Sequence, residues 1–274
     1  LGILSTGYGL GFATMGTVFP GIVDLFSWRH AWFFLGTLAL LMAIVNGLFL
    51  RNDPASAGWQ PWGQKEEPQG DVSTNAKPGQ REVSLPALLK DSRFWLIGLS
   101  YFAIAYSLYS ITTFMVDYAK YQLALPLEQA SFLATIHGIG QIVGVLTVLP
   151  LSDYLGRKKT IIISNSMITA ALAGILIAGD SWIMLCVFIG CLAIFYGATF
   201  PIYGACAGDY FPREIMATVI GAWTPFYGAG AILTHWITGI LRDKTGIYNQ
   251  SFLICVIMAG LAALLIIRLK KAES

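Results

Sequence analysis

The stretch that decides the fold is residues 130–178, ASFLATIHGIGQIVGVLTVLPLSDYLGRKKTIIISNSMITAALAGILIA. It contains two apolar runs, Ala130–Leu151 and Thr160–Ala178, and the short loop between them carries one acid and three consecutive basic residues. A helix of about 20 mostly apolar residues is long enough to cross the hydrocarbon core of a bilayer. The pattern therefore predicts two membrane-spanning helices joined by a charged turn.

Apolar runs of the same kind fill most of the chain. The other six are Ile3–Phe26, Ala31–Leu50, Phe94–Tyr118, Trp182–Ala207, Met216–Leu241 and Phe252–Leu269. Of the 274 residues, 56% are hydrophobic and only 12% are charged, about half the charged fraction of an ordinary soluble domain. We therefore expect an all-α, multi-pass integral membrane protein with about eight transmembrane helices and with membrane lipids as partners. The net charge of +2 is too small to indicate a nucleic-acid partner.

Residues 51–93 interrupt this pattern. They contain five prolines and the charged run Lys65–Glu67, so we expect a largely irregular linker outside the membrane. The last part of the linker, residues 84–91, predicts a short amphipathic helix at the membrane surface, with Ser84 as its cap and Pro86 in its first turn. The linker leaves two predicted spans before it and six after it.

The distribution of Lys and Arg predicts the orientation of the spans. If the linker is cytoplasmic, thirteen of the 17 basic residues lie on its side of the membrane and only four, Arg29, Lys120, Arg242 and Lys244, lie on the other. Because Lys and Arg favour the cytoplasmic ends of spans, we expect both the linker and the C-terminus to face the cytoplasm. The chain opens at Leu1, already inside an apolar run, and we expect it to begin part-way through a longer protein.

The loop at residues 149–159, LPLSDYLGRKK, resembles the signature G-x-x-x-D-R-x-G-R-R/K of the major facilitator superfamily. It keeps the acid, the glycine and the basic pair, and it departs at Leu149 and Tyr154. The residues that match, Asp153, Gly156, Arg157 and Lys158, are our candidates for a gating loop. A glycine permits a tight turn, and a carboxylate can face the positive N-terminus of a neighbouring helix. The alternative is a basic loop that sets topology and has no gating role.

Three further segments resemble parts of the same family. Asp209–Arg213 is similar to the loop between helices ten and eleven, and by this resemblance Asp209 would pair with Arg157 and help to close a cavity in one conformation. Residues 241–248 are similar to the external turn before the last helix, and residues 28–33 are similar to the start of helix six.

The resemblance covers essentially the whole chain and implies a division into three parts. Residues 1–50 would be the last two helices of an N-terminal bundle, residues 51–93 the cytoplasmic central linker, and residues 94–274 a C-terminal bundle of six helices. The chain would then hold helices five to twelve of a twelve-helix bundle. Its partners would include the missing N-terminal helices of the same protein.

Polar residues inside the spans are costly in a bilayer, so they mark a cavity or a contact between helices. Four lie on one face of the third span at helical spacing, and others lie on the fourth, sixth and seventh spans. The candidate substrate-binding residues are Tyr106, Tyr109, Ser110, Thr113, His137, Gln141, Tyr196, Tyr203, Trp223 and Tyr227. His137 lies about 14 Å deep at 1.5 Å per residue, where it could exchange a proton, bond an anionic substrate, or be a satisfied structural histidine. For the tyrosines and threonines, the alternative is hydrogen bonding between packed helices.

The resemblance implies a secondary transporter of a small solute that works by alternating access and is coupled to protons or to exchange. Within this family, the chain resembles the porters of the monocarboxylate and oxalate–formate kind. This resemblance favours an organic acid as the substrate. We expect the plasma (cell inner) membrane as the location. A solute receptor without transport, and a transporter of a neutral metabolite or drug, are the alternatives. The sequence contains no GxSxG, HExxH or P-loop motif, so we expect no enzyme activity. The four cysteines form no CxxC pair, so we expect no metal site and no cofactor.

Overall fold

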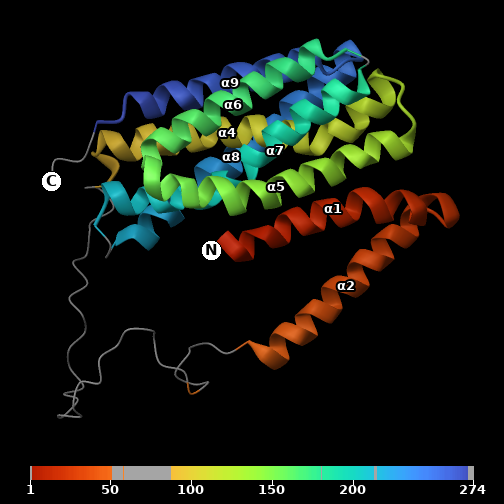
Figure 1. Cartoon of the computed structure of the whole chain (residues 1–274), viewed down its shortest axis with the longest axis horizontal. Helices are drawn as coiled ribbons and strands as arrows, with labels where there is room; N and C mark the ends of the chain where they lie inside the picture. Colours follow the sequence, from red (N-terminus) through yellow and green to blue (C-terminus); the bar gives the residue numbers. More distant parts are fainter. Residues whose placement is uncertain (1, 51–57, 59–87, 180, 213–214, 271–274) are drawn as a thin grey trace. The chain divides into compact units, whose positions relative to one another are not determined.

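The computed structural model describes residues 2–50, 58, 88–179, 181–212 and 215–270, and within these ranges its regular structure is entirely helical (Figure 1). The elements are α1 (Gly2–Leu25), α2 (Trp28–Phe49), α4 (Ser92–Asp117), the π-helical turn η2 (Tyr118–Gln122), α5 (Leu127–Leu155), α6 (Arg157–Ile177), α7 (Trp182–Tyr210), α8 (Met216–Thr245) and α9 (Asn249–Ile267). Each predicted apolar run forms a helix, with ends shifted by a few residues. The predicted all-α fold is therefore confirmed.

Seven of the described helices are long and apolar enough to cross a membrane. α1 is not among them, because six of its 24 residues are glycine and several others carry hydroxyl groups. At 1.5 Å per residue its length is nevertheless about 36 Å, enough for the hydrocarbon core. Most of the predicted linker, including residues 84–87 of the predicted amphipathic helix, lies outside the described residues. Residues 88–93 are described, and α4 already begins at Ser92.

The chain forms two compact units, residues 21–81 and a larger unit of residues 1–20 with 82–274. In the smaller unit, the described residues are mainly those of α2, a 22-residue helix with largely exposed apolar side chains. The division predicted from the sequence, at residues 50 and 93, remains a prediction.

In the larger unit, the first three helices of the six from α4 to α9 interleave with the last three. α4 packs along α8 and α9, α6 packs along α7 and α9, and α5 packs along α7. Of the consecutive helices, α6 and α7 pack along each other, whereas the pairs α4 and α5, α5 and α6, α7 and α8, and α8 and α9 contact each other much less. Figure 1 shows the arrangement of the helices. Any site between these helices is therefore assembled from residues that lie far apart in the sequence.

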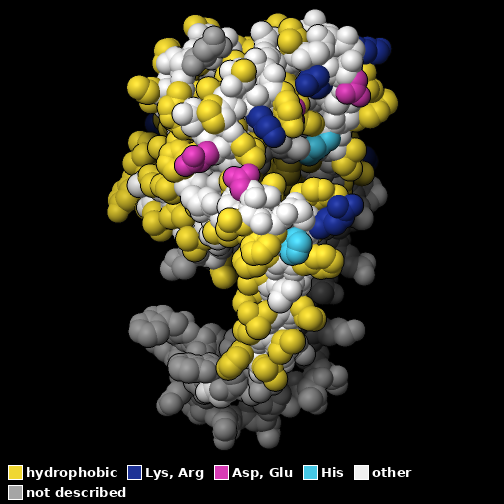
Figure 2. Space-filling model, turned by 90° about the vertical axis from the view of Figure 1, so that its right-hand side faces the viewer, with side chains coloured by type: hydrophobic (Ala, Val, Ile, Leu, Met, Phe, Trp, Pro, Cys, Tyr) yellow, Lys and Arg dark blue, Asp and Glu magenta, His cyan; other side chains and the backbone are white. Residues whose placement is uncertain are grey.

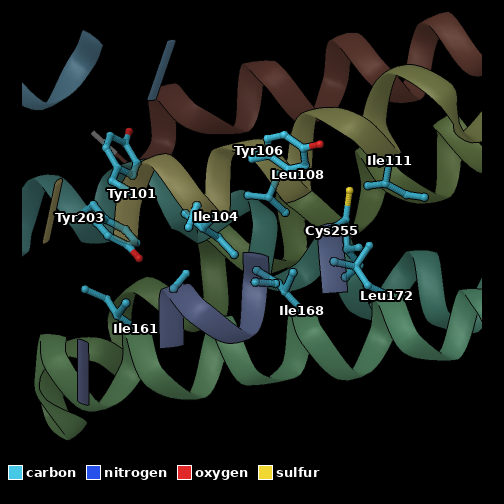
Figure 3. Packing of buried hydrophobic residues seen from close by; sticks show 14 of the residues in the cluster. Tyr101, Ile104, Tyr106, Leu108, Ile111, Ile161, Ile168, Leu172, Tyr203 and Cys255 are labelled. Atoms are coloured by element: carbon cyan, nitrogen blue, oxygen red, sulfur yellow. The ribbon is translucent and has the colours of Figure 1, made fainter. Parts of the chain in front are cut away.

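The bundle has an apolar interior and a largely apolar exterior. Figure 3 shows the interior, where the labelled side chains of α4, α6, α7 and α9 converge: Tyr101, Ile104, Tyr106, Leu108, Ile111, Ile161, Ile168, Leu172, Tyr203 and Cys255. Hydrophobic side chains also cover much of the surface seen in Figure 2, where charged ones are few. Leu146 and Leu253, for example, are 56% and 53% exposed. Water would disfavour so much exposed apolar area, whereas the acyl chains of a bilayer solvate it. The protein is a multi-pass integral membrane protein.

Candidate functional site

Among the described residues of the larger unit, two cavities are lined by several helices, and a third is lined by α1 alone. The wider cavity has a volume of about 820 Å³ and is lined by residues of α4, α5, α6, α7 and α8. The narrower cavity has a volume of about 330 Å³ and is lined by residues of α1, α4, α5, α7 and α8. Both volumes are typical of sites for small molecules.

The narrower cavity gathers hydroxyl and amide groups without any charged side chain among its lining residues. Its polar lining residues are Ser5, Tyr8, Tyr109, Thr112, Gln141, Tyr196 and Tyr227. The rings of Tyr109 and Tyr227 meet edge to face, with centroids 5.5 Å apart. The side chain of Tyr196 interacts with those of Tyr227 and Thr112. Phenol, hydroxyl and amide groups in an otherwise apolar wall suit a small solute with several oxygen atoms.

His137 lies behind this wall and is fully buried. Its ring packs between Phe12 and Tyr196, at centroid distances of 5.3 and 5.1 Å. Its Nδ1 lies 2.9 Å from Nε2 of Gln141. With that amide nitrogen as donor, Nδ1 accepts and the ring proton of the neutral imidazole lies on Nε2. Nε2 has no hydrogen-bond partner among the described residues, and it is a buried donor beneath the lining, since His137 itself does not line the cavity.

Of the four predicted residues on α4, only Tyr109 lines a cavity, because the other three face α8. Ser110 Oγ lies 3.2 Å from Thr238 Oγ1, and Thr113 Oγ1 lies 2.7 Å from Nε2 of His235. Tyr106 packs where α4 passes close to the backbone of α8. For Ser110 and Thr113 the structure shows the hydrogen bonding between helices that the sequence left open as the alternative, whereas the Tyr106 hydroxyl has no hydrogen-bond partner among the described residues.

Tyr203 and Trp223 line the wider cavity, but their polar atoms are bonded within the protein. The Tyr203 hydroxyl lies 2.7 Å from Ser100 Oγ, and Trp223 Nε1 donates to the Phe94 carbonyl at 3.1 Å. Both therefore present ring surfaces to the cavity. Gln141, Tyr196 and Tyr227 line the narrower cavity with Tyr109, so the structure brings four of the ten predicted residues together there.

Sequence reasoning missed Tyr8, Thr112 and Tyr101. Tyr8 lies on the glycine-rich α1, three residues after Ser5, and that spacing was the available signal. Thr112 lies three residues after Tyr109, on the same side of α4, and lines the same cavity. Tyr101 lies nearer the start of α4 than the predicted set.

Comparison with known proteins identifies the family. The family model of the Major Facilitator Superfamily matches residues 1–122 and 97–274. The chain belongs to the Major Facilitator Superfamily. It is 23% identical to the hexuronate transporter of Bacillus subtilis (strain 168), over 98% of this chain and 64% of that protein. It is 24% identical to monocarboxylate transporter 12 of Rattus norvegicus, over 93% of this chain and 56% of that protein. The chain thus spans less than two thirds of the length of these relatives.

Solved structures agree on the fold. A crystal structure of the Escherichia coli fucose:proton symporter FucP matches 72% of this chain and 48% of its own, with a TM-score of 0.57 and 16% sequence identity. A second structure of FucP, in the outward conformation, matches with a TM-score of 0.54. The resemblance to the Major Facilitator Superfamily that was drawn from the sequence is therefore confirmed.

The loop that resembles the Major Facilitator Superfamily signature forms a tight turn between α5 and α6. Gly156 has a φ of +87°, in the left-handed region that glycine enters without strain. Arg157 forms an ion pair with Asp153 and donates a hydrogen bond to Ser152 Oγ. Among the described residues the guanidinium pairs with this acid one helical turn away, and Asp209 lies close enough only to feel its charge. The predicted pairing of Asp209 with Arg157 is thus not formed in this conformation.

Lys158 of the same loop contacts the end of α9. Its Nζ donates to the carbonyl oxygens of Ile267 and Leu269, at 3.1 and 2.5 Å. The last carbonyls of a helix lack partners within the helix and carry partial negative charge. Lys158 therefore ties the cytoplasmic loop predicted from the sequence to the C-terminal end of the bundle.

Proposed function

We propose that this chain is part of a secondary transporter that moves a small carboxylate-bearing solute by alternating access, driven by protons or by exchange. The carrying observation is the narrower cavity, in which four tyrosines gather with Gln141, whose amide bonds to the buried His137. The names of two relatives, a hexuronate transporter and a monocarboxylate transporter, share a carboxylate as the chemical feature of their solutes.

The cavity offers a carboxylate what it requires in an apolar environment. Burying an ionised carboxylate is costly unless several donors surround it. Hydrogen bonds to a charged acceptor are roughly twice as strong as those between neutral groups. The phenol hydroxyls and the Gln141 amide can donate such hydrogen bonds. The residues that line the cavity come from five different helices.

His137 supports proton coupling in this proposal. No Lys or Arg lies among the lining residues of the narrower cavity, so the negative charge of a solute is not compensated there by a fixed cation. Histidine is the side chain that gains and loses a proton near physiological pH. A proton on His137 would compensate the solute charge, so the two would move together.

A neutral, hydroxyl-rich solute is the second candidate. The observation that favours it is the same uncharged lining, since phenol and amide groups pair equally well with sugar hydroxyls. It requires no compensating proton. The two candidates therefore differ in their dependence on a proton gradient.

The test uses the protein that contains this chain, reconstituted in proteoliposomes. Uptake of a labelled hexuronate, a labelled monocarboxylate and a labelled neutral hexose is measured with and without an imposed proton gradient. We expect saturable uptake of a carboxylate that falls when the gradient is dissipated. In His137→Phe we expect gradient-driven uptake to fall at least tenfold. Saturable uptake of the hexose alone would replace the carboxylate proposal by the neutral one.

A further inference from the structure

Aromatic side chains lie where the two cavities adjoin. Phe200 and Pro201 of α7 line both cavities. On the opposite side, Tyr101 of α4 lines the wider cavity and Tyr227 of α8 lines the narrower one. The rings of Tyr101 and Tyr227 are stacked, with centroids 4.5 Å apart. Stacked rings at this distance are in van der Waals contact, so no solute passes between them while they remain together.

Tyr101 is held from its other face. Its ring also stacks on that of Tyr203, with centroids 4.7 Å apart, as Figure 3 shows for the two labelled rings. Ser100 Oγ donates to the Ala262 carbonyl at 2.8 Å, so it must accept from the Tyr203 hydroxyl at 2.7 Å. The hydroxyl oxygen of Tyr203 in turn accepts from Asn165 Nδ2 at 3.0 Å. This directed chain of hydrogen bonds joins α6, α7, α4 and α9 and fixes the Tyr203 ring.

Tyr227 lies close to a proline inside α8, where the helix lacks one backbone hydrogen bond. Pro225 lies inside the helix, two residues before it, and removes the hydrogen bond to the carbonyl of Gly221. A side chain added at Gly221 or at Gly228 would meet no atom within 4 Å. α8 is also the least buried of the helices α4–α9. Sharp kinks in helices arise at proline.

We propose that Tyr101 and Tyr227 form an aromatic barrier between two stations of the solute path, and that Asn165 and Ser100 are positioning residues that hold Tyr101 through Tyr203. The path rests on the proposed function, but the barrier itself does not depend on which solute is carried. Because Tyr101 stacks on Tyr203, which is hydrogen-bonded across four helices, we expect opening to move Tyr227 and the segment of α8 around Pro225. A solute in the narrower cavity reaches the wider one only after this movement.

The test measures access to the narrower cavity without any solute. A cysteine is placed at Thr112, which lines that cavity, in the protein that contains this chain with Cys186 and Cys191 replaced by alanine. A small, charged, membrane-impermeant thiol reagent is applied from the side that Arg157 faces, and the rate of modification is recorded. We expect Tyr101→Ala to raise this rate at least tenfold and Tyr101→Phe, which keeps the ring, to leave it within twofold.

A separate variant tests the positioning role of Asn165. Asn165→Leu removes the donor to Tyr203, and we expect the modification rate to rise at least threefold. Ser164→Ala changes the neighbouring residue, whose buried hydroxyl has no hydrogen-bond partner among the described residues, and we expect no change. An Asn165→Leu rate equal to that of Ser164→Ala would refute the positioning role, because loss of packing alone would affect both.

Matched variants keep the barrier falsifiable. Phe226→Ala removes an adjacent ring on α8 that packs on Phe94 and Trp95 and lines neither cavity, so we expect its rate to stay within twofold. If Tyr101→Ala does not elute as a monodisperse protein, Tyr227→Ala tests the barrier in its place. We expect it to raise the modification rate by the same factor of at least ten. Rates within twofold of the parent in the folded alanine variants would overturn the barrier. Failure of carboxylate uptake would leave the labelling result intact, so the two proposals fail separately.

Discussion

His137 and Gln141 show how one hydrogen bond serves a buried imidazole in a membrane protein. The bond from Nε2 of Gln141 to Nδ1 of His137 is 2.9 Å long, and both side chains are buried. Gln141→Leu would leave Nδ1 without a partner, and an unsatisfied buried polar group costs about 1–3 kcal/mol. We expect the free energy of unfolding to fall by about that amount, measured as a lower Tm in detergent.

The control for this pair is a double-mutant cycle. His137→Phe with Gln141→Leu replaces both partners by apolar groups, which is close to neutral when shape is conserved. We expect the double variant to recover most of the stability lost in Gln141→Leu. If the two losses add instead, the bond does not couple these residues.

Asp91 provides a pH-dependent contribution outside the membrane. It accepts a hydrogen bond from the backbone nitrogen of Arg93 at 2.8 Å and pairs with its guanidinium at 2.7 Å. The hydrogen bonds from the Arg93 side chain hold the pKa of Asp91 below its ordinary value, although burial opposes them. A depressed folded-state pKa stabilises the protein above the unfolded value of about 3.9, and this contribution is lost as the pH falls through the folded pKa.

Asp91→Asn isolates the charge, because asparagine caps a helix about as well as aspartate. At pH 7 we expect a loss of at most about 1 kcal/mol, since the pair is partly exposed to solvent. The difference in Tm between the two proteins should shrink below about pH 4. If the difference in Tm stayed constant down to about pH 3, which is below the unfolded-state pKa of Asp91, the ion pair would not be the source of that difference.

At the scale of helices, the contact of α1 with α5 depends on glycine. A Cβ at Gly9 would lie 2.6 Å from both the Gly138 carbonyl oxygen and Cγ1 of Ile142, whereas a Cβ at Gly11 would meet no atom within 4 Å. Glycines that let helix backbones approach in this way are common in membrane proteins. We expect Gly9→Ala to cost about 1–3 kcal/mol through overpacking.

Gly11→Ala is the matched control on the same helix. Alanine favours the helix over glycine by about 1 kcal/mol, so we expect Gly11→Ala to keep or raise the Tm in detergent. Equal effects of the two substitutions would mean that helix propensity, and not the contact with α5, governs both positions.

At the scale of the whole molecule, the basic residues predict which end of the bundle faces the cytoplasm. Tyr154, beside the α5–α6 loop, is 88% exposed, and Tyr121 of η2 is 62% exposed. In intact cells we expect an impermeant maleimide to label Tyr121→Cys from outside and to label Tyr154→Cys only after permeabilisation. The unsubstituted protein gives the background from its own cysteines. Labelling of Tyr154→Cys in intact cells would reverse the orientation.

The sequence alone determined the elements of this protein. Apolar runs of about 20 residues have few alternatives to helix in a bilayer, because every backbone N–H and C=O must be bonded within its own segment. The glycine between α5 and α6 and the family resemblance could be read in the same way. All of these are local properties of the chain.

Only the tertiary structure decided which polar side chains share a site. Tyr109 and Ser110 are neighbours on one predicted face of α4, yet Tyr109 lines the cavity and Ser110 bonds to Thr238. The outcome depends on where α8 packs, and α8 begins about a hundred residues later in the chain. Likewise, spacing in the sequence could not place Tyr101 between Tyr203 and Tyr227. Helical periodicity predicts toward which side of its own helix a side chain points. Whether that side borders a cavity depends on how far away the neighbouring helix packs.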